Sequence, residues 1–461
     1  MEVGPLGSGP RKLVMEKPRV LLFNDNAKRD LLGIRLLENA LRRRGARTAI
    51  CNPQNAKVKL LQFRPHALVA ARGDHAIARE ASRLCKVFVV AGEGAQQTKE
   101  TMLSVFMGRG YWKLDSVAWI TRCYLWSQQT ENWLLETSLF NAGQLRVVGN
   151  PRLDIYRDAA LISGLSKKGG PFRLGVAFSA KSTSTYYGHP RFAKVYHDMH
   201  REMTFPITQP GRHFEDVVWR DHAILRNMMR SLRAFLEGSD GEVWLRPSPF
   251  ESPKEFAFLE RAYPGRVKVM PNQTLPEFLC GVDAVLTCWS TVGLEGLLLG
   301  KPVVSIAGLI DQEHLFRHIS PKASGFETFA QFYHQPQSEE ELLGLLGRAA
   351  AGQLAPSSRA HAEVDDLLAQ LFAWPGSQAA CELIADDISG ELYGATARPL
   401  NDWKVELQLR RNLPLSLAAL LVSLRMLAVT ARSGEFRAYW DFLRTSDPAI
   451  ESLLGRMSQG G

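Results

Sequence analysis

Two hydroxyl side chains stand at the start of a predicted helix within residues 285–304. Ser290 and Thr291 follow an apolar strand, and the backbone N–H groups of the helix's first turn face whatever binds there, together with the positive end of its dipole. Such a turn binds anions, and in an α/β sheet it lies at the carboxyl edge, where ligands are bound. Glu295, about one turn further along, offers an acceptor for sugar hydroxyls. An ordinary βαβ unit with a hydroxyl cap fits the same local pattern.

A second strand exit offers a cation for the same anion. The segment 244–251 (WLRPSPFE) closes a predicted strand, and the guanidinium of Arg246 suits phosphate recognition because its donors are paired and always charged. Prolines on both sides of Ser248 stiffen the loop. We predict that Arg246 and Ser248 bind phosphate together with Ser290. The alternative is a rigid strand exit with a surface arginine.

A carboxylate follows the predicted strand at 87–91. Glycines on both sides of Glu93 let the backbone turn sharply and leave the carboxylate open to the crevice. A carboxylate in that place is a candidate general base for activating a hydroxyl. A glycine-rich turn with a solvated glutamate is the alternative.

Three charged side chains lie where the first strand meets its helix. Asp25, Lys28 and Arg29 are acceptor-side candidates, or they cap the helix. His189 belongs to an excursion at 179–222 that is rich in His, Tyr and Arg. Because long loops in compact domains are often functional, we predict His189 as a further acceptor-side contact, with a surface role as the alternative.

Apolar strands separated by helical patterns must position these residues. They occur in two series, which predicts parallel sheets covered on both faces. The predicted strands are 19–23, 67–71, 87–91, 124–126 and 146–148, then 173–178, 242–246, 266–270, 283–287 and 302–306. A glycine-rich stretch at 164–171 separates the series. We therefore predict two Rossmann-like domains, at 18–163 and 171–395, that face a ligand-binding cleft.

Composition narrows the class of protein. A chain of 461 residues with 45% hydrophobic and 22% charged residues is typical of a globular protein. The net charge of +9 indicates anionic ligands, but no nucleic-acid-binding module accompanies it, so no nucleic acid is expected. Six scattered cysteines without a C-x-x-C pair argue against a zinc site and suit a reducing compartment. Residues 1–17 lack an apolar core, so we expect a flexible N-terminus and a cytoplasmic protein.

Residues 396–461 form a predicted C-terminal helical extension. A basic block at 404–412 precedes an apolar block at 413–429. One interpretation is a peripheral contact with an anionic membrane through 404–432. The alternative, which we favour, is a pair of helices that packs back across the two domains.

Four segments occur in the order found in one known family. They are 25–47, then Gly92-Glu-Gly94, then Leu125-Trp126 leading to Gly149-Asn-Pro-Arg-Leu-Asp154, and finally 245–252 with 290–295. Across residues 18–310 the chain resembles bacterial surface-carbohydrate biosynthesis proteins of GT-B glycosyltransferase architecture. These are related to capsule-polysaccharide and Kdo transferases and to CDP-glycerol glycerophosphotransferases.

The resemblance implies a division of labour between the halves. The N-terminal half would bind the acceptor, with Glu93 as the catalytic base. The C-terminal half would bind the nucleotide-sugar donor, with Arg246, Ser290 and Thr291 at its phosphates. Relatives that use CMP-activated acidic sugars, such as Kdo or sialic acid, need no metal because protein donors neutralise the leaving phosphate. No metal or cofactor is therefore expected.

Two positions depart from the family. Ser248 stands where the family has a histidine, and a hydroxyl donates a hydrogen bond without carrying positive charge. Gly92 stands where the family has a first acidic residue, which leaves Glu93 as the single carboxylate of that motif.

The sequence thus predicts a cytoplasmic GT-B glycosyltransferase, with the inner face of the cytoplasmic membrane as an alternative location. It would transfer a sugar from a nucleotide donor to a hydroxyl of a surface polysaccharide or lipid-linked glycan. Two other classes stay open. A non-hydrolysing nucleotide-sugar epimerase shares the architecture but needs no acceptor. A catalytically degraded scaffold that binds glycan or membrane would accommodate the changes at Ser248 and Gly92.

Overall fold

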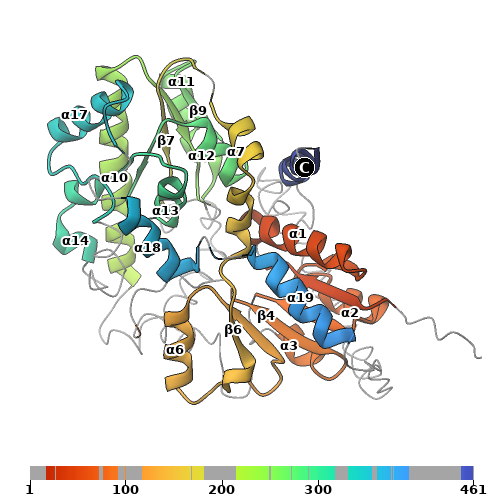
Figure 1. The fold of residues 1–461 in the computed structure, drawn as a ribbon. Coiled ribbons are helices and arrows are strands. Elements are labelled where there is room, and N and C mark those ends of the chain that lie inside the picture. Colours follow the sequence, from red (N-terminus) through yellow and green to blue (C-terminus); the bar gives the residue numbers. More distant parts are fainter. Residues whose placement is uncertain are drawn as a thin grey trace, which may run out of the picture.

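The computed structural model describes residues 17–25, 27–71, 76–91, 99, 117–167, 169–180, 214–248, 251–270, 273–288, 290–316, 331–355, 361–374, 376, 378–393 and 448–459. Within them the chain forms two parallel β-sheets with helices packed around them (Figure 1). The predicted architecture of two α/β domains is confirmed.

The N-terminal sheet has the strand order β2-β1-β3-β4-β5-β6, and all neighbouring strands run parallel. The strands are β1 (Arg19–Phe23), β2 (Arg47–Cys51), β3 (Ala67–Ala70), β4 (Lys86–Val90), β5 (Arg122–Leu125) and β6 (Leu145–Val147). The predicted strands of this half are all present. Strand β2 was missed because it forms the edge of the sheet, where its sequence RTAIC mixes polar and apolar residues.

The second sheet has the order β11-β10-β7-β8-β9, again with parallel neighbours. Its strands are β7 (Arg173–Val176), β8 (Glu242–Leu245), β9 (Val267–Val269), β10 (Ala284–Thr287) and β11 (Val303–Ser305). All four residues of β10 are buried, as its continuous apolar run predicts for a strand covered on both faces.

Each sheet contains one point where the order of strand addition reverses. In the first sheet it lies between β1 and β3, and in the second between β7 and β10. Connections on the two sides of such a point leave in opposite directions, so a crevice opens at the carboxyl ends of the strands. The fold therefore has, in each domain, one edge of the kind at which doubly wound sheets bind ligands.

Two apolar cores hold the sheets. The larger core surrounds the N-terminal sheet and continues onto one face of the second sheet, and the smaller core covers the other face. The covering helices are α1 (Ala27–Arg43), α2 (Ala56–Phe63), α3 (Ala76–Ala81), α6 (Gln128–Glu136), α7 (Ala159–Leu165), α10 (Phe214–Gly238), α11 (Ala257–Ala262), α12 (Leu275–Gly281), α13 (Thr291–Leu298), α14 (Gln312–Phe316), α17 (Glu339–Ala350) and α18 (His361–Phe372).

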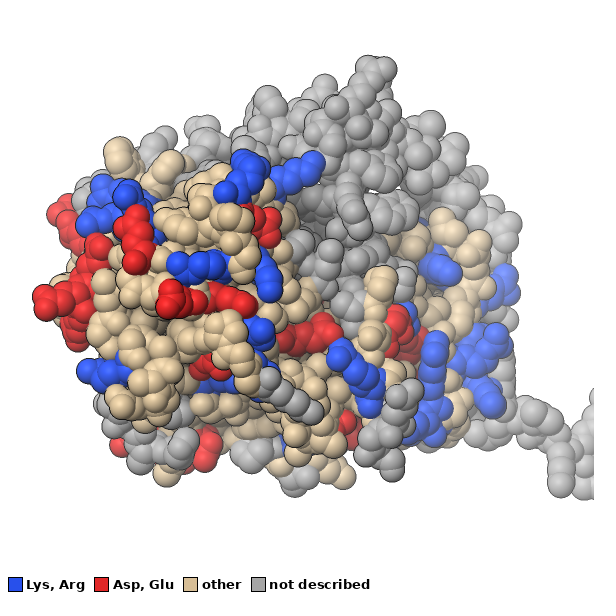
Figure 2. Space-filling view, turned by 90° about the horizontal axis from the view of Figure 1, so that it is seen from above, with Lys and Arg blue, Asp and Glu red and all other residues tan. Residues whose placement is uncertain are grey.

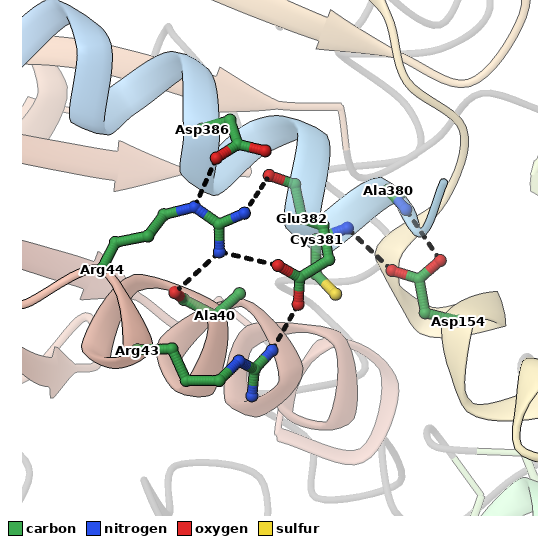
Figure 3. A network of polar contacts seen from close by, with 8 residues as sticks. All are labelled: Ala40, Arg43, Arg44, Asp154, Ala380, Cys381, Glu382 and Asp386. Atoms are coloured by element: carbon green, nitrogen blue, oxygen red, sulfur yellow. Dashed lines mark hydrogen bonds and ion pairs between the residues drawn. The ribbon is translucent and has the colours of Figure 1, made fainter. Parts of the chain in front are cut away.

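The chain returns to the N-terminal domain through helix α19 (Ala380–Tyr393), which packs along α1 (Figure 3). Buried Asp154 caps α19 by accepting hydrogen bonds from the backbone N–H of Ala380 at 2.9 Å and of Cys381 at 2.7 Å. Arg44 of the first domain pairs with Glu382 at 2.7 Å. The sequence placed residues 171–395 in one C-terminal domain. These contacts instead attach α19 to the N-terminal domain.

A last described helix, α23 (Pro448–Gln459), lies between the two domains. Glu451 pairs with Arg35 of α1 at 2.6 Å, and Arg456 pairs with Glu277 of α12. Helix α23 thus contacts both domains, whereas the rest of the predicted extension, at 396–447, lies outside the described residues. Residues 404–432, the predicted membrane contact, lie outside the described residues. Among the helices described, none combines the length and apolar character that crossing a bilayer requires.

Charge is unevenly distributed over the surface. In Figure 2, acidic side chains gather at the end of the molecule where α17 lies, whose first turn holds Glu339, Glu340 and Glu341. Lysine and arginine side chains gather at the opposite end, which belongs to the N-terminal domain.

Candidate functional site

The predicted anion turn begins helix α13 at the carboxyl edge of β10. Ser290 is the N-cap, and its side chain accepts a hydrogen bond from the backbone N–H of Val292 at 3.3 Å. Thr291 is exposed. The buried Tyr333 holds this turn in place, because its hydroxyl donates a hydrogen bond to the Ser290 carbonyl at 3.3 Å. A Cβ at Gly293 would lie 2.6 Å from that tyrosine ring, so only glycine fits there.

Arg246 leaves strand β8 toward the same edge. Its backbone N–H continues the ladder by donating to the carbonyl of Val176 at 2.9 Å. The guanidinium has no hydrogen-bond or ion-pair partner within the described part of the chain, and its Nε is shielded from water. Burial lowers the pKa of Arg246, and the nearby charge of Arg152 lowers it further, while Glu295 and Tyr156 act in the opposite direction. Arg246 is therefore a partly buried cation without a counterion of its own.

Glu295 lies beside Arg246 but already has partners. Its carboxylate is 2% exposed. Tyr156 donates its hydroxyl hydrogen to Oε2 at 2.6 Å, and Nη2 of Arg152 lies 3.0 Å from Oε1. Burial, followed by the charge of Glu295, raises the pKa of Tyr156 well above its usual value. The group thus contains two guanidinium ions, one carboxylate and one neutral phenol, which leaves an excess of positive charge.

Arg152 and Tyr156 come from η3 (Pro151–Arg157), the 3-10 helix that follows the last strand of the first sheet. Asn150 caps this helix by accepting a hydrogen bond from the N–H of Arg152 at 3.0 Å. The sequence of this segment carries part of the family resemblance but predicts no role for Arg152 or Tyr156. Their partner lies on α13, 139 residues away from Tyr156, and no local pattern reveals such a contact.

Glu251 organises the loop that carries Ser248. Its buried carboxylate accepts hydrogen bonds from the backbone N–H of Ser248 at 2.7 Å and of Ala180 at 2.6 Å. These two N–H groups follow β8 and β7, so Glu251 ties together the loops at two adjacent strand ends. Glu251 is the last residue of the segment 244–251, which the sequence marks as a candidate site. Its place in that segment was the signal that could have identified it.

The N-terminal domain has a cavity at its own ligand-binding edge. It measures about 70 Å³ and is lined by the carboxyl ends of β1, β3 and β4, by Trp126 and by residues of α1 and η3. Arg29 lies in its wall and pairs with the neighbouring Asp30 at 2.6 Å. Nη2 of Arg29 also lies 3.8 Å from Asp25. The structure thus places two of the predicted acceptor-side residues together at this edge.

The structure does not test several of the predicted residues. Glu93, Gly92 and His189, together with the side chain of Lys28, lie outside the described residues. Within the described part, no three His, Cys, Asp or Glu side chains are grouped to hold a metal ion.

No family model and no curated protein matches the chain. A structure of a variant of the wall teichoic acid polymerase TagF is similar, with 11% identity and a TM-score of 0.52 over 82% of this chain and 90% of that one. The S. aureus MnaA–UDP complex gives 11% identity and a TM-score of 0.49 over 83% and 99% of the chains.

A UDP-GlcNAc 2-epimerase from Methanocaldococcus jannaschii gives 14% identity and a TM-score of 0.47, and the match covers 81% of this chain and 99% of that one. Likeness at such low identity concerns the fold alone. The likeness to the TagF structure, together with the two parallel sheets and the returning helix α19, shows that the chain has the GT-B fold.

Proposed function

We propose that this chain is a nucleotide-sugar-dependent glycosyltransferase. The observation that carries the proposal is Arg246, a cation at the carboxyl edge of the second sheet whose guanidinium has no hydrogen-bond or ion-pair partner among the residues that the structure describes. An unpaired charge withdrawn from water is costly, so such a group calls for an anionic ligand. Phosphate satisfies a guanidinium through two parallel hydrogen bonds.

The donor phosphates would lie between Arg246 and the start of α13. The first-turn N–H groups of α13 and the hydroxyls of Ser290 and Thr291 supply further donors. Ser248 adds a hydroxyl from the loop that Glu251 holds in place. With two guanidinium ions against one carboxylate, the group around Glu295 gains an electrostatically favourable partner when an anion binds.

Glu295 would contact the ribose of the donor. Both of its carboxylate oxygens already face Tyr156 and Arg152. A carboxylate oxygen accepts more than one hydrogen bond, so ribose hydroxyls would either share these oxygens or displace one of the two partners.

For the chemical step, Glu93 would accept the proton of the acceptor hydroxyl, whose oxygen then attacks the anomeric carbon while the bond to the leaving phosphate breaks. Arg246 and the N–H groups of α13 would stabilise the charge that develops on that phosphate, which makes a metal ion unnecessary. The finer assignment is a CMP-linked acidic sugar as donor and a bacterial surface glycan or lipid-linked glycan as acceptor. For residues 404–432, packing across the two domains is the favoured interpretation, and contact with the anionic inner face of the cytoplasmic membrane is the alternative.

Two assays test this proposal. A thermal-shift panel of CMP, CDP, UDP and GDP should raise the unfolding temperature for one base in particular. With the matching nucleotide sugar, the wild type should transfer sugar to an acceptor glycan, and Glu93→Gln should abolish transfer while leaving the nucleotide shift intact. Glu136→Gln, at an exposed glutamate of α6, is the matched control and should behave as wild type. Unchanged turnover in Glu93→Gln would refute the mechanism. Conversion of the sugar nucleotide without an acceptor would indicate an epimerase instead.

A further inference from the structure

The positive charge of the chain is concentrated in its first 64 residues, which end with helix α2. This part of the sequence has fourteen lysines and arginines against five aspartates and glutamates. The excess of nine equals the net charge of the whole chain, so the remaining residues are electrically balanced when taken together. Figure 2 accordingly shows lysine and arginine side chains gathered at the end of the molecule that belongs to the N-terminal domain.

The topology brings many of these cations to one edge of the first sheet. In a parallel sheet with helical connections, strands begin and helices end at the same edge, which is opposite to the carboxyl edge with its crevice. Six cations lie at the start of β1 and β2 or at the end of α1 and α2. We call them the basic edge: Lys17, Arg19, Arg42, Arg43, Arg47 and Arg64.

Contacts between the elements hold these cations close together. Arg19 and Arg47 are register partners on neighbouring strands, and Nε of Arg19 donates to the carbonyl of Arg64 at 2.7 Å. Nε of Arg42 donates to the hydroxyl of Thr48, the residue after Arg47, at 2.7 Å. A carbonyl or hydroxyl oxygen accepts a hydrogen bond without neutralising a guanidinium. Like charges held this close repel each other, and a bound anion would relieve the repulsion.

Part of this charge is accessible from solvent. Lys17 and Arg47 are exposed, and neither forms an ion pair with a residue that the structure describes. Arg43 pairs with Glu382, which also pairs with Arg44, and the Arg43 side chain nevertheless stays 61% exposed (Figure 3). Exposed ion pairs contribute little energy, so such an arginine can also contact an anion from outside. The basic edge therefore presents positive charge to an anionic partner.

An exposed aromatic ring beside the cations indicates which partner. Tyr393 ends α19 and is 40% exposed, and its hydroxyl donates to the carbonyl of Arg44 at 3.0 Å. Tyrosine is enriched where proteins meet lipid headgroups, because its ring is apolar and its hydroxyl is polar. Clustered lysines and arginines attract the anionic lipids of the same surface. A nucleic acid is disfavoured because no nucleic-acid-binding module accompanies the charge.

We propose that the basic edge binds the anionic headgroups of a phospholipid membrane. Because the basic edge lies at the amino ends of the strands, a membrane in contact with it would leave the crevice at their carboxyl ends open. This surface is distinct from residues 404–432. The binding requires neither nucleotide nor acceptor, so it does not rest on the proposed glycosyltransferase function.

Co-sedimentation of the full chain with lipid vesicles tests the proposal. The chain should bind vesicles made of equal parts phosphatidylcholine and phosphatidylglycerol, and should not bind vesicles of phosphatidylcholine alone. Raising the salt concentration from about 0.1 M to about 1 M shortens the Debye length from about 10 Å to about 3 Å and should release the chain. Equal binding to both kinds of vesicle, or binding to neither, would overturn the proposal.

A variant that combines Lys17→Gln, Arg43→Gln and Arg47→Gln locates the binding. Each cation near an anionic surface contributes about fivefold in affinity, so the affinity for the anionic vesicles should fall about a hundredfold.

The matched control removes the same net charge from the second domain. It combines substitutions by glutamine at three exposed arginines of helices α10, α11 and α17, namely Arg226→Gln, Arg261→Gln and Arg348→Gln. This control should bind the vesicles as the wild type does. Thermal unfolding shows whether both variants are folded.

Amide hydrogen exchange locates the contact on the unmodified chain. Anionic vesicles should slow exchange in residues 42–48 and leave the exchange of α17 unchanged, and this result decides the matter should the basic-edge variant unfold. The proposal is refuted if the folded variant binds as the wild type does, which would place the contact elsewhere, for example at 404–432. Equal losses in the variant and its control would refute it too, because net charge alone would then account for the binding.

Discussion

Replacing Arg246 by methionine should change stability and nucleotide affinity in opposite directions. Methionine keeps much of the side-chain volume and removes the charge. The Arg152–Glu295 pair at 3.0 Å and the Tyr156 hydrogen bond at 2.6 Å remain, so the group around Glu295 becomes electrically balanced. Apolar replacement of buried ionic groups is often neutral or stabilising by about 1–4 kcal/mol. Because Arg246 is only partly buried, we expect the low end, about 1 kcal/mol, or about 2–4 °C in the unfolding temperature.

Nucleotide binding should weaken in the same variant. Hydrogen bonds to charged groups contribute about 1.5–3 kcal/mol each, and loss of one such interaction raises the Kd about 10- to 150-fold. Thermal unfolding without nucleotide and calorimetric titration with the nucleotide that gives the largest shift measure the two quantities independently.

Arg266→Met is the matched control. That guanidinium donates to the carbonyl of Leu236 at 2.7 Å and to that of Gly241 at 2.9 Å, so it is a satisfied structural arginine. Its loss should destabilise the chain and leave the Kd unchanged. The reasoning is refuted if Arg246→Met behaves like Arg266→Met, with lower stability and unaltered nucleotide affinity.

Three further predictions concern the contacts that join distant parts of the chain. Tyr156→Phe removes the hydroxyl that donates a hydrogen bond to the buried carboxylate of Glu295. The free energy of unfolding, measured by urea titration, should fall by about 2 kcal/mol. An unchanged value would mean that this hydrogen bond makes no net contribution to stability. Asp154→Asn weakens the cap of α19 and should cost about 1–2 kcal/mol, visible as faster amide hydrogen exchange confined to α19, whereas uniform exchange would contradict a local role. Burial raises the pKa of Glu382, but hydrogen bonds and charges from Arg44 and its neighbour outweigh burial, so the net pKa lies below 4.5. The stabilisation is therefore complete above pH 4.5 and lost as the pH falls through the lowered value; the unfolding temperature should drop there, and Arg44→Gln should flatten that drop.

Local patterns were sufficient to predict the sheets and the hydroxyl-capped turn that begins α13. Strands such as β10 are continuous apolar runs because both faces are buried, and Ser290 caps α13 through a bond two residues along the chain. Edge strand β2 was not predicted, because only one of its five residues is fully buried and its sequence therefore lacks a continuous apolar run. Patterns of this kind report burial and short-range bonding, and nothing beyond them.

Contacts between distant residues account for what the sequence did not reveal. Helix α19 was assigned to the C-terminal domain because it follows that domain in the chain, yet Arg44 and Glu382 pair across 338 residues. Glu295 was predicted to face a ligand from its position on α13 alone. Its partner Tyr156 precedes it by 139 residues, so this hydrogen bond is visible only in the fold, where η3 lies beside α13.

The short helix η3 makes the two halves of the site depend on one another. Arg152 lines the cavity of the N-terminal domain and also pairs with Glu295 of α13 in the second domain, and Tyr156 bonds to the same carboxylate. Asp154, between them, caps the helix that returns to the N-terminal domain. A substitution in η3 should therefore weaken stability and binding together, because the same bonds serve both. Arg246 participates in none of those bonds, and for that reason its replacement alone should separate the two effects.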